Sequence, residues 1–200
     1  MSNDYEFTKD WFAHAPEVWE HLIPMLPGTP GERSFLEIGS YEGRSAVWIA
    51  ENMMEEGDTL LCIDTWKGGE EHSGEDMLEV HQRFLRNMEK LENLKQVNWG
   101  FVRAPSAAAI ASYFSGRQPL LAFIYIDGSH QAKDVLTDAC MAWQVLAPGG
   151  IMVFDDYLWG DPRDVLHRPK LAIDAFVNIF AEDLTVLHVG HQLAIKRNEG

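Results

Sequence analysis

The sequence predicts a doubly wound α/β domain with a mostly parallel, seven-stranded sheet and an antiparallel C-terminal strand. Three observations lead to this prediction. Five apolar strand-like segments alternate with helix-like segments, which is typical of a parallel sheet with helices on both faces. The second of these segments, 59–63, is short and continuously apolar, as expected for a strand buried on both faces. The last two strand segments are almost directly joined, so they must pair as an antiparallel hairpin.

The first predicted element is a helix within residues 7–26, where aromatic and aliphatic side chains recur at mostly helical spacing. Pro16 suits a first helical turn, and the Pro-Gly-Thr-Pro-Gly segment at 27–31 ends the helix. We therefore expect one domain that consists of an N-terminal helical extension, 1–31, and an α/β core, 32–200. In the core, strands are expected at about 34–38, 59–63, 97–102, 120–126, 151–154, 184–189 and 191–196, and helices at about 43–54, from the loop at 65–76 to about 94, 106–115, 131–146 and 170–180.

Turn residues separate these elements. Gly57 and Asp64 bound the second strand, and the Pro-Gly-Gly segment at 148–150 separates the helix at 131–146 from the fifth strand. The loop before the last helix contains Gly160, Pro162 and Pro169.

Composition limits the class of protein. A chain of 200 residues suits one domain that buries about 70% of its unfolded surface. The formal net charge of −15 and the scattered Lys and Arg residues disfavour nucleic acid as a partner. No apolar run reaches the ~18 residues of a transmembrane helix, and the polar, acidic N-terminus is unlike a signal peptide. Cys62 and Cys140 form no C-x-x-C pair and lie in apolar segments. We expect buried thiols and a cytoplasmic protein.

The most informative segment is the glycine turn that follows the first strand. Glu37 precedes Gly39, which lets the backbone approach a ligand closely, and Gly43 lies where the next helix begins. This spacing differs from the G-x-G-x-x-G of dinucleotide-binding turns. A carboxylate at Glu37 would repel a phosphate and attract a cationic amino group. The turn therefore favours S-adenosylmethionine, which carries an amino group, a sulfonium and a ribose but no phosphate, over NAD.

Two other strand ends supply candidate contacts for that ligand. Asp64 lies 25 positions after Gly39, where a carboxylate would accept hydrogen bonds from ribose hydroxyls; the alternative is a loop cap. Trp66 is a candidate to lie against adenine or, alternatively, a core aromatic residue. Ser106 is either a contact to the adenine edge or the N-cap of a helix.

Three aspartates follow the fourth and fifth strands and form a candidate metal site. Asp127, Asp155 and Asp156 would meet if these strands are neighbours, and three carboxylates suit a hard cation such as Mg²⁺ or Ca²⁺. Without a cation they would repel one another and one would stay protonated, unless Asp156 points into solvent. Zinc is disfavoured because neither cysteine lies on this rim. His130 is a candidate general base, or a histidine that is only hydrogen-bonded in the first turn of a helix.

Four segments in this order resemble the class I S-adenosylmethionine-dependent methyltransferases, and most of all the small bacterial branch that includes cephalosporin-biosynthesis and sugar O-methyltransferase relatives. They are Phe35-Leu-Glu-Ile-Gly-Ser-Tyr-Glu-Gly-Arg-Ser45, Cys62-Ile-Asp-Thr-Trp66, Tyr125-Ile-Asp-Gly-Ser-His130 and Pro148-Gly-Gly-Ile-Met-Val-Phe-Asp-Asp-Tyr157. The resemblance implies a Rossmann-like methyltransferase fold and, in metal-dependent relatives, a cation on acids that match Asp127, Asp155 and Asp156. Sugar methyltransferases of this type place their proposed base where this chain has Ser129. Either His130 takes over deprotonation or the metal alone acidifies the hydroxyl.

We therefore expect a methyltransferase that methylates oxygen on a small hydroxylated metabolite with help from a divalent cation. The alternatives are a metal-independent enzyme, acting for instance on nitrogen, and a non-catalytic methyltransferase-like subunit. No membrane partner is expected, and the aromatic N-terminal segment makes a second copy of the chain a candidate partner. The expected site residues are His130 and Asp127 for catalysis, Asp127, Asp155 and Asp156 for metal, and Glu37, Gly39, Ser40, Gly43, Ser45, Asp64, Thr65, Trp66, Ser106 and Asp127 for S-adenosylmethionine.

Overall fold

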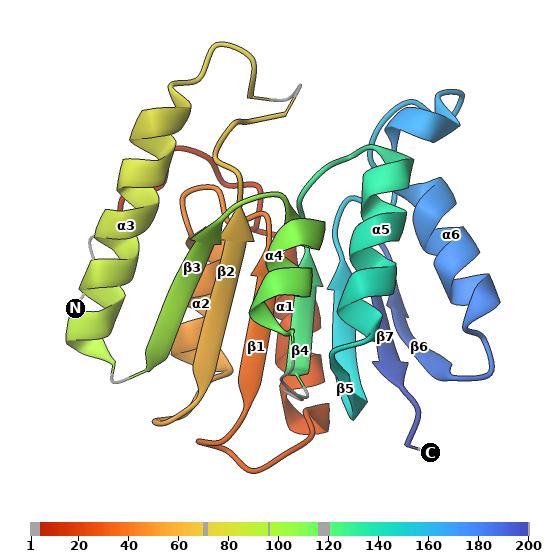
Figure 1. Ribbon diagram of the computed structural model, residues 1–200, viewed down its shortest axis with the longest axis horizontal. Coiled ribbons are helices and arrows are strands. Elements are labelled where there is room, and N and C mark those ends of the chain that lie inside the picture. The colour runs from red at the N-terminus through yellow and green to blue at the C-terminus, as the bar shows by residue number, and fades with distance from the viewer. Residues whose placement is uncertain (1–4, 70–71, 96, 116–120, 200) are drawn as a thin grey trace.

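The computed structural model describes residues 5–69, 72–95, 97–115 and 121–199. Seven strands form one sheet in the order β3-β2-β1-β4-β5-β7-β6 (Figure 1). The first five pair in parallel, and β7 is antiparallel to both β5 and β6. The predicted fold class is thereby confirmed. The strands are β1 (Ser34–Ile38), β2 (Thr59–Asp64), β3 (Asn98–Arg103), β4 (Leu121–Ile126), β5 (Leu146–Phe154), β6 (Leu184–Val189) and β7 (Leu193–Arg197).

Helices cover both faces of the sheet. The apolar side chains of α1, α2 and α3 pack with one face, and those of α4, α5 and α6 pack with the other (Figure 1). Among the described residues, no helix is long and apolar enough to cross a membrane. The helices are α1 (Ala15–Leu22), α2 (Arg44–Asn52), α3 (Met77–Leu94), α4 (Ser106–Tyr113), α5 (Ala132–Trp143) and α6 (Lys170–Ile179), with short 3₁₀ turns η1 (Ile23–Met25) and η3 (Val165–His167).

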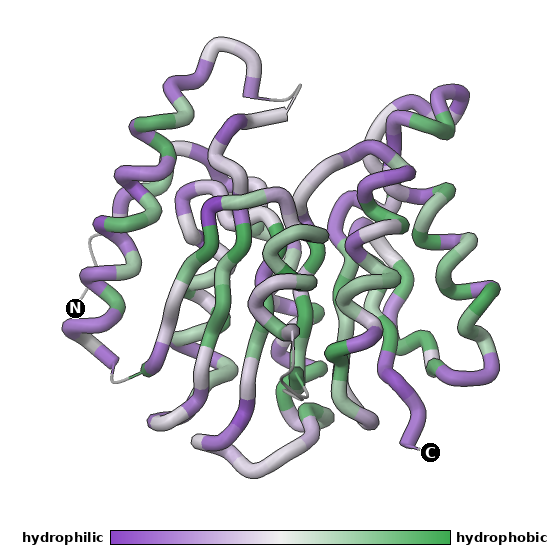
Figure 2. Tube along the Cα trace, in the orientation of Figure 1, coloured by the Kyte–Doolittle hydropathy of each residue, from purple (hydrophilic) through white to green (hydrophobic). Residues whose placement is uncertain are grey.

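The central strands carry the core, because both of their faces are covered by helices. Every residue of β4 is buried, and Figure 2 shows hydrophobic residues concentrated along the central strands. Alternate residues of β1 point to opposite faces: Phe35 packs on the side of α1–α3 and Leu36 on the side of α4–α6. This alternation also decides which strand-end side chains reach the site.

Trp19 anchors α1 in this core. Its side chain is fully buried and packs edge-on against the rings of Phe123 and Tyr125 in β4. The Trp19 indole Nε1–H donates to Oε1 of Gln192 at 2.8 Å, so the helix is also tied to the segment between β6 and β7.

The N-terminal helix begins at Ala15 with Pro16 in its first turn, as predicted. The backbone before it is held elsewhere: Thr8 N–H and Oγ1–H both donate to Glu42. The structure corrects one predicted boundary. The fifth strand starts at Leu146 rather than 151, since the predicted break at 148–150 is absorbed by a register shift against β4. The predicted start of the fourth strand, Leu120, lies outside the described residues.

Candidate functional site

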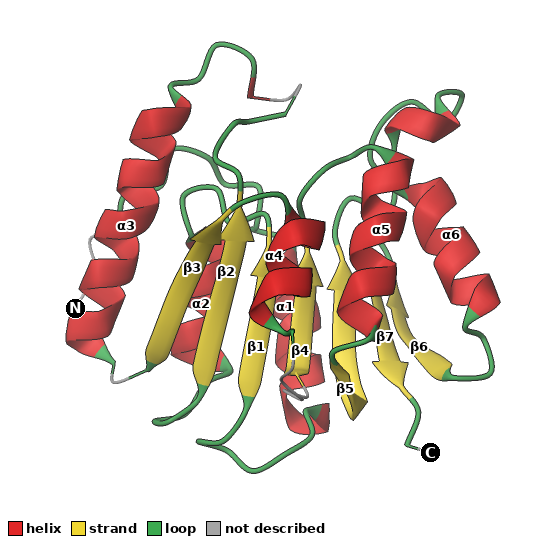
Figure 3. Cartoon of the chain, viewed as in Figure 1, coloured by secondary structure: helices red, strands yellow, loops and turns green. Residues whose placement is uncertain are grey.

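A cavity of about 1060 Å³ opens at the carboxyl ends of β1, β2, β4 and β5. Figure 3 shows the loops that follow these strands gathered at one edge of the sheet. β1 and β4 are neighbours in the sheet, and the chain leaves them toward α2 and α5 on opposite faces. This is the topological switch point at which open α/β sheets bind ligands.

The glycine turn after β1 lies tightly against the end of β4. Gly39 has a φ of +87°, and a Cβ at this position would lie 1.9 Å from the backbone oxygen of Asp127. Only glycine fits such an approach. Tyr41, in the same turn, and Trp66, after β2, are non-glycine residues with positive φ. Such strained backbone is concentrated at ligand sites in many proteins.

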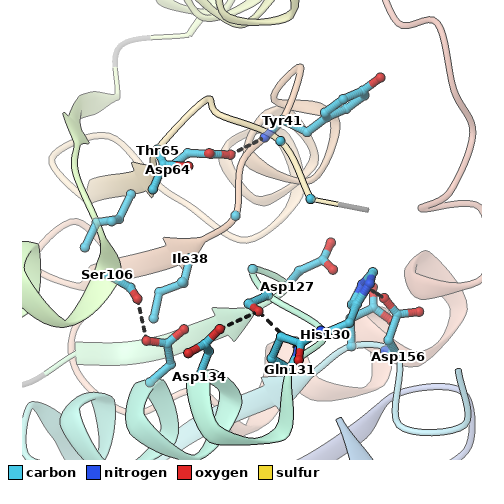
Figure 4. A pocket seen from close by; sticks show the side chains of 18 of the residues that line it. Ile38, Tyr41, Asp64, Thr65, Ser106, Asp127, His130, Gln131, Asp134 and Asp156 are labelled. Atoms are coloured by element: carbon cyan, nitrogen blue, oxygen red, sulfur yellow. Dashed lines mark hydrogen bonds and ion pairs between the residues drawn. The ribbon is translucent and has the colours of Figure 1, made fainter. Parts of the chain in front are cut away.

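Asp64 joins the two turns that form one wall of the cavity. Its Oδ2 accepts the N–H groups of Ser40 at 2.9 Å and Tyr41 at 3.0 Å, and its Oδ1 accepts the N–H of Trp66 at 2.7 Å. Figure 4 shows Asp64 bonded to Tyr41 on the cavity wall. A carboxylate has about four acceptor sites. With three used by backbone, one remains for a ribose hydroxyl.

Glu37, which we predicted to contact the ligand directly, does not line the cavity. The strand alternation turns its side chain away from the rim and into the core beside α2, where it is completely buried. Ser45 Oγ–H donates to Oε1 of Glu37 at 2.5 Å, while Oε2 has no partner among the described residues. Burial raises the pKa of Glu37 to about 7, although hydrogen bonds to the carboxylate oppose the shift.

This burial predicts a pH-dependent stability. The folded-state pKa of Glu37 lies above its ordinary value of 4.5, so the folded chain binds more protons between pH 4.5 and 7 and loses stability as pH rises through 7. As pH rises, the free energy of unfolding of the wild type should fall by about 3 kcal/mol because Glu37 ionises in the core. We expect this fall to be absent in Glu37→Gln. Urea titrations at pH 5 and pH 8 measure it, with Glu32→Gln, an exposed glutamate, as control. Parallel pH profiles for wild type and Glu37→Gln would contradict this result.

The remaining predicted cofactor contacts divide into two groups. Gly39, Asp64, Thr65, Ser106 and Asp127 line the cavity. Those outside the lining are Ser40, Gly43, Ser45 and Trp66, together with Glu37.

Trp66 is a core residue, as the alternative interpretation held, and the predicted adenine contact is wrong. Its side chain is almost completely buried and packs against Phe84. The positive φ of Trp66 directs the ring inward, where Nε1–H donates to the backbone oxygen of Tyr41 at 2.9 Å.

Ser106 lies at the start of α4 without capping it. Its hydroxyl donates to Asp138 of α5, and burial raises the pKa of Asp138 to about 6.

Asp127 and Asp155 lie on either side of the Tyr125 hydroxyl. The phenol oxygen is 3.0 Å from Oδ2 of Asp127 and also contacts Oδ2 of Asp155. Burial, and next the negative charges of Asp155 and Asp156, hold the pKa of Asp127 well above its ordinary range. Burial also acts on Asp155, but hydrogen bonds from His14 and Tyr125 outweigh it and lower its pKa. The Tyr125 hydroxyl has one proton to donate to two carboxyl groups. Since the pKa of Asp127 is raised and that of Asp155 is lowered, we infer that Asp127 is the protonated member of the pair.

His130 and Asp156 form a close pair that lines the cavity beside Asp127. Nε2 of His130 is 2.7 Å from Oδ2 of Asp156 (Figure 4). The His130 ring packs on Trp159 with centroids 4.2 Å apart. Asp156 has a φ of +56°, so its backbone is bent to present the carboxylate to the histidine. Asp156 therefore does not simply point into solvent.

Two histidines that sequence reasoning missed complete this rim. His14 Nε2 lies 3.3 Å and His191 Nδ1 3.6 Å from Oδ1 of Asp155. Among the described residues, groups of side chains able to hold a metal are His14, Asp155 and His191, and Asp127, His130 and Asp156. The predicted set of three aspartates is thus divided, and each part contains imidazole. Hairpin closure brings His191 to β5, and no local pattern in the sequence signals it.

Comparison with known proteins shows the family to which the chain belongs. A family model described as a methyltransferase domain matches residues 36–157. No curated protein matches the chain. Among solved structures, the O-methyltransferase TomG of Streptomyces achromogenes, involved in tomaymycin synthesis and solved with S-adenosylmethionine, is 16% identical over 92% of this chain and 79% of its own, with a TM-score of 0.65.

Two further solved structures share the fold. An O-methyltransferase from Bacillus cereus, in complex with S-adenosylhomocysteine, is 15% identical over 92% of this chain and 82% of its own, with a TM-score of 0.61. MycE, a methyltransferase of the mycinamycin biosynthetic pathway solved with Mg and S-adenosylhomocysteine, is 15% identical over 97% of this chain and 51% of its own, with a TM-score of 0.60. At identities this low, the structural similarity shows a common fold and nothing more.

Proposed function

Because the chain belongs to the methyltransferase-domain family of class I S-adenosylmethionine-dependent enzymes, we propose that it methylates a hydroxyl group of a small molecule. The observation that carries this proposal is the cavity lining. Its described residues include no Lys or Arg, and the acids in it are Asp10, Asp64, Asp127, Asp134, Asp138, Asp155 and Asp156. Such a lining suits a cationic sulfonium and ammonium and repels phosphate, which argues against NAD and against nucleic acid.

The residues present fit S-adenosylmethionine. The Gly39 turn brings backbone to the cavity without a Cβ, and Asp64 retains one acceptor site for a ribose hydroxyl. Thr65 and Ser106 line the same half of the cavity. When bound, S-adenosylmethionine supplies the methyl group as a sulfonium. The task of the chain is to position the acceptor oxygen and to exclude water.

His130 is the base in this proposal. Asp156 holds Nε2 of the imidazole at 2.7 Å and Trp159 packs against its face, so the ring is fixed in the cavity wall. A proton from the acceptor would go to Nδ1 once the acceptor reaches that buried atom. A histidine oriented by a carboxylate can take the proton of the acceptor hydroxyl, as general bases do. This arrangement favours oxygen as the methylated atom, since a neutral amine needs no base before it attacks.

The extension formed by residues 1–31 borders the acceptor side in this proposal, because Trp11 and His14 line the cavity. We also place the protein in the cytoplasm, on the support of two free cysteines, Cys62 and Cys140.

The test of the proposed function is calorimetric titration of the chain with S-adenosylhomocysteine and, separately, with NAD. We expect binding of the first alone, and Asp64→Ala to weaken it by ten- to a hundredfold (about 1.5–3 kcal/mol), because charge-assisted hydrogen bonds are lost. Asp10→Ala removes the same charge from the cavity lining and serves as the control, because Asp10 pairs with Arg44 at 3.5 Å and not with the N–H groups that Asp64 holds. Preferential binding of NAD would refute the assignment.

We further propose that a divalent cation assists the reaction at Asp127, Asp155 and Asp156. The support is that all three line the cavity, with Asp127 and Asp156 in one group of metal-ligating side chains and Asp155 in the other, and that MycE was solved with Mg. Carboxylates are the ligands that Mg²⁺ and Ca²⁺ prefer. When bound, a cation supplies charge that favours the deprotonated hydroxyl.

Chelation tests the cation directly. After exhaustive EDTA treatment, we expect methyl transfer to fall at least about tenfold and to return when Mg²⁺ is added back. Full activity without metal would leave the His130–Asp156 pair as the sole means of deprotonation, and the enzyme would be metal-independent.

A further inference from the structure

Three cavity residues from separate parts of the chain converge on one point at the rim. His14 precedes α1, Asp155 follows β5, and His191 lies in the hairpin between β6 and β7. Their ligand atoms all lie within 4.8 Å of one another, and the two imidazole rings are 4.7 Å apart between centroids. Two histidines and a carboxylate are a common ligand set of transition-metal sites.

Two of the three ligand–ligand distances in this group match those around a bound metal ion. At metal–ligand distances of about 2.0–2.2 Å in a tetrahedral arrangement, neighbouring ligand atoms are roughly 3.4 Å apart. Oδ1 of Asp155 lies 3.3 Å from Nε2 of His14 and 3.6 Å from Nδ1 of His191. An ion could therefore enter with small side-chain movements.

The surroundings of Asp155 direct one lone pair toward the histidines. Its Oδ2 is held by the Tyr125 hydroxyl, and its Oδ1 accepts the N–H of Asp156 at 2.8 Å. The other acceptor site of Oδ1 faces His14 and His191 and takes part in a hydrogen bond with Nε2 of His14 at 3.3 Å, which a metal ion would replace. Contacts such as those from Tyr125 and Asp156 orient the ligands of metal sites.

We propose that His14, Asp155 and His191 bind a divalent transition-metal ion, of the class that accepts imidazole together with carboxylate, such as Zn²⁺, Mn²⁺ or Co²⁺. Mg²⁺ binds poorly to such a set because it prefers oxygen ligands. Since all three residues line the cavity, the remaining coordination positions face it and are open to water or to an acceptor oxygen. This site shares Asp155 with the set proposed for Mg²⁺, so the two ions would compete for that residue. It concerns metal binding and does not rest on the proposed methyl transfer.

Cobalt is the probe that tests this site, because Co²⁺ bound by nitrogen and oxygen at low coordination number absorbs visible light. Co²⁺ is titrated into the wild-type chain and into His14→Ala, His191→Ala, His130→Ala and His21→Ala. His21 lies in α1, outside the cavity lining, and is the matched control. We expect visible absorption in the wild type, at least a tenfold weaker affinity in His14→Ala and His191→Ala, and no change in His21→Ala and His130→Ala. A tenfold excess of Mg²⁺ should not displace the cobalt.

Three results would overturn the proposal: no absorption in the wild type, displacement by Mg²⁺, or loss of absorption in His130→Ala with retention in His14→Ala. The last would place the ion on Asp127, His130 and Asp156. Thermal melting of each variant, and its affinity for S-adenosylhomocysteine, show whether it still folds. Failure of S-adenosylhomocysteine to bind to the wild type would refute the proposed function and leave the metal result to stand by itself.

Discussion

Gly39→Ala is expected to destabilise the chain by roughly 2–5 kcal/mol and to abolish binding of S-adenosylhomocysteine. Two costs add: an L-residue at a φ of +87° costs about 1–2 kcal/mol, and crowding against a packed neighbour costs about 1–3 kcal/mol. The new methyl group would lie 1.9 Å from the backbone oxygen of Asp127, so the turn must move away from β4. The movement also displaces the N–H groups of Ser40 and Tyr41 that Asp64 holds.

Gly74→Ala separates these two costs. Gly74 has nearly the same φ, +88°, but a Cβ there would meet nothing within 4 Å. We expect it to lose only the conformational part, about 1–2 kcal/mol, and to bind S-adenosylhomocysteine normally. Urea unfolding and calorimetry measure both variants. Equal losses of stability in Gly39→Ala and Gly74→Ala would show that the close approach of the turn to β4 is unimportant.

His130→Ala is expected to lower the turnover rate by about 10²–10⁴-fold while the affinity for S-adenosylhomocysteine stays within about twofold of wild type. Asp156→Asn should also lower the rate strongly, since it keeps a side chain 2.7 Å from Nε2 but removes the charge that orients the imidazole. Transfer of a labelled methyl group to a panel of small hydroxylated acceptors gives the rates.

Ser129→Ala is the control for His130→Ala. Ser129 lines the same cavity one residue away, but its hydroxyl donates to Asp134 at 2.8 Å and accepts the N–H of Gln131, so it serves the start of α5. We expect its turnover to stay near wild type. If His130→Ala transfers methyl groups within a few-fold of wild type, the histidine is structural and the site has no dedicated base at this position.

The fold could be predicted from the sequence because the spacing of apolar residues within each segment distinguishes strands from helices. Apolar runs such as 59–63, and the closely joined final strands, determine the parallel and antiparallel parts of the sheet. Pro16 predicted where the N-terminal helix begins. The aromatic residues before Ala15 also have helical spacing, but that spacing does not reveal that Thr8 is held by Glu42, far along the chain. The spacing of apolar residues does not reveal a contact between distant parts of the chain that keeps a segment from forming a helix.

The site could be predicted only as far as strand ends determine it. Asp64, Asp127 and Asp156 reach the cavity because they follow strands whose carboxyl ends meet at one edge. Glu37 precedes the end of β1 by one residue, and the alternation of side chains turns it into the core. His14 and Asp155 are 141 positions apart, so their contact depends on how the N-terminal segment crosses the sheet, which no local pattern contains.

The bond from Trp19 to Gln192 spans 173 positions, and this separation affects how the protein is made. Contacts between such distant residues are slow to form, because a long loop must close before they contribute stability. At a synthesis rate of about 5–20 residues per second, β1 to β5 can emerge from the ribosome well before the hairpin that carries His191. The acceptor side of the cavity is therefore assembled last, and a nascent chain that already holds the glycine turn would still lack this wall.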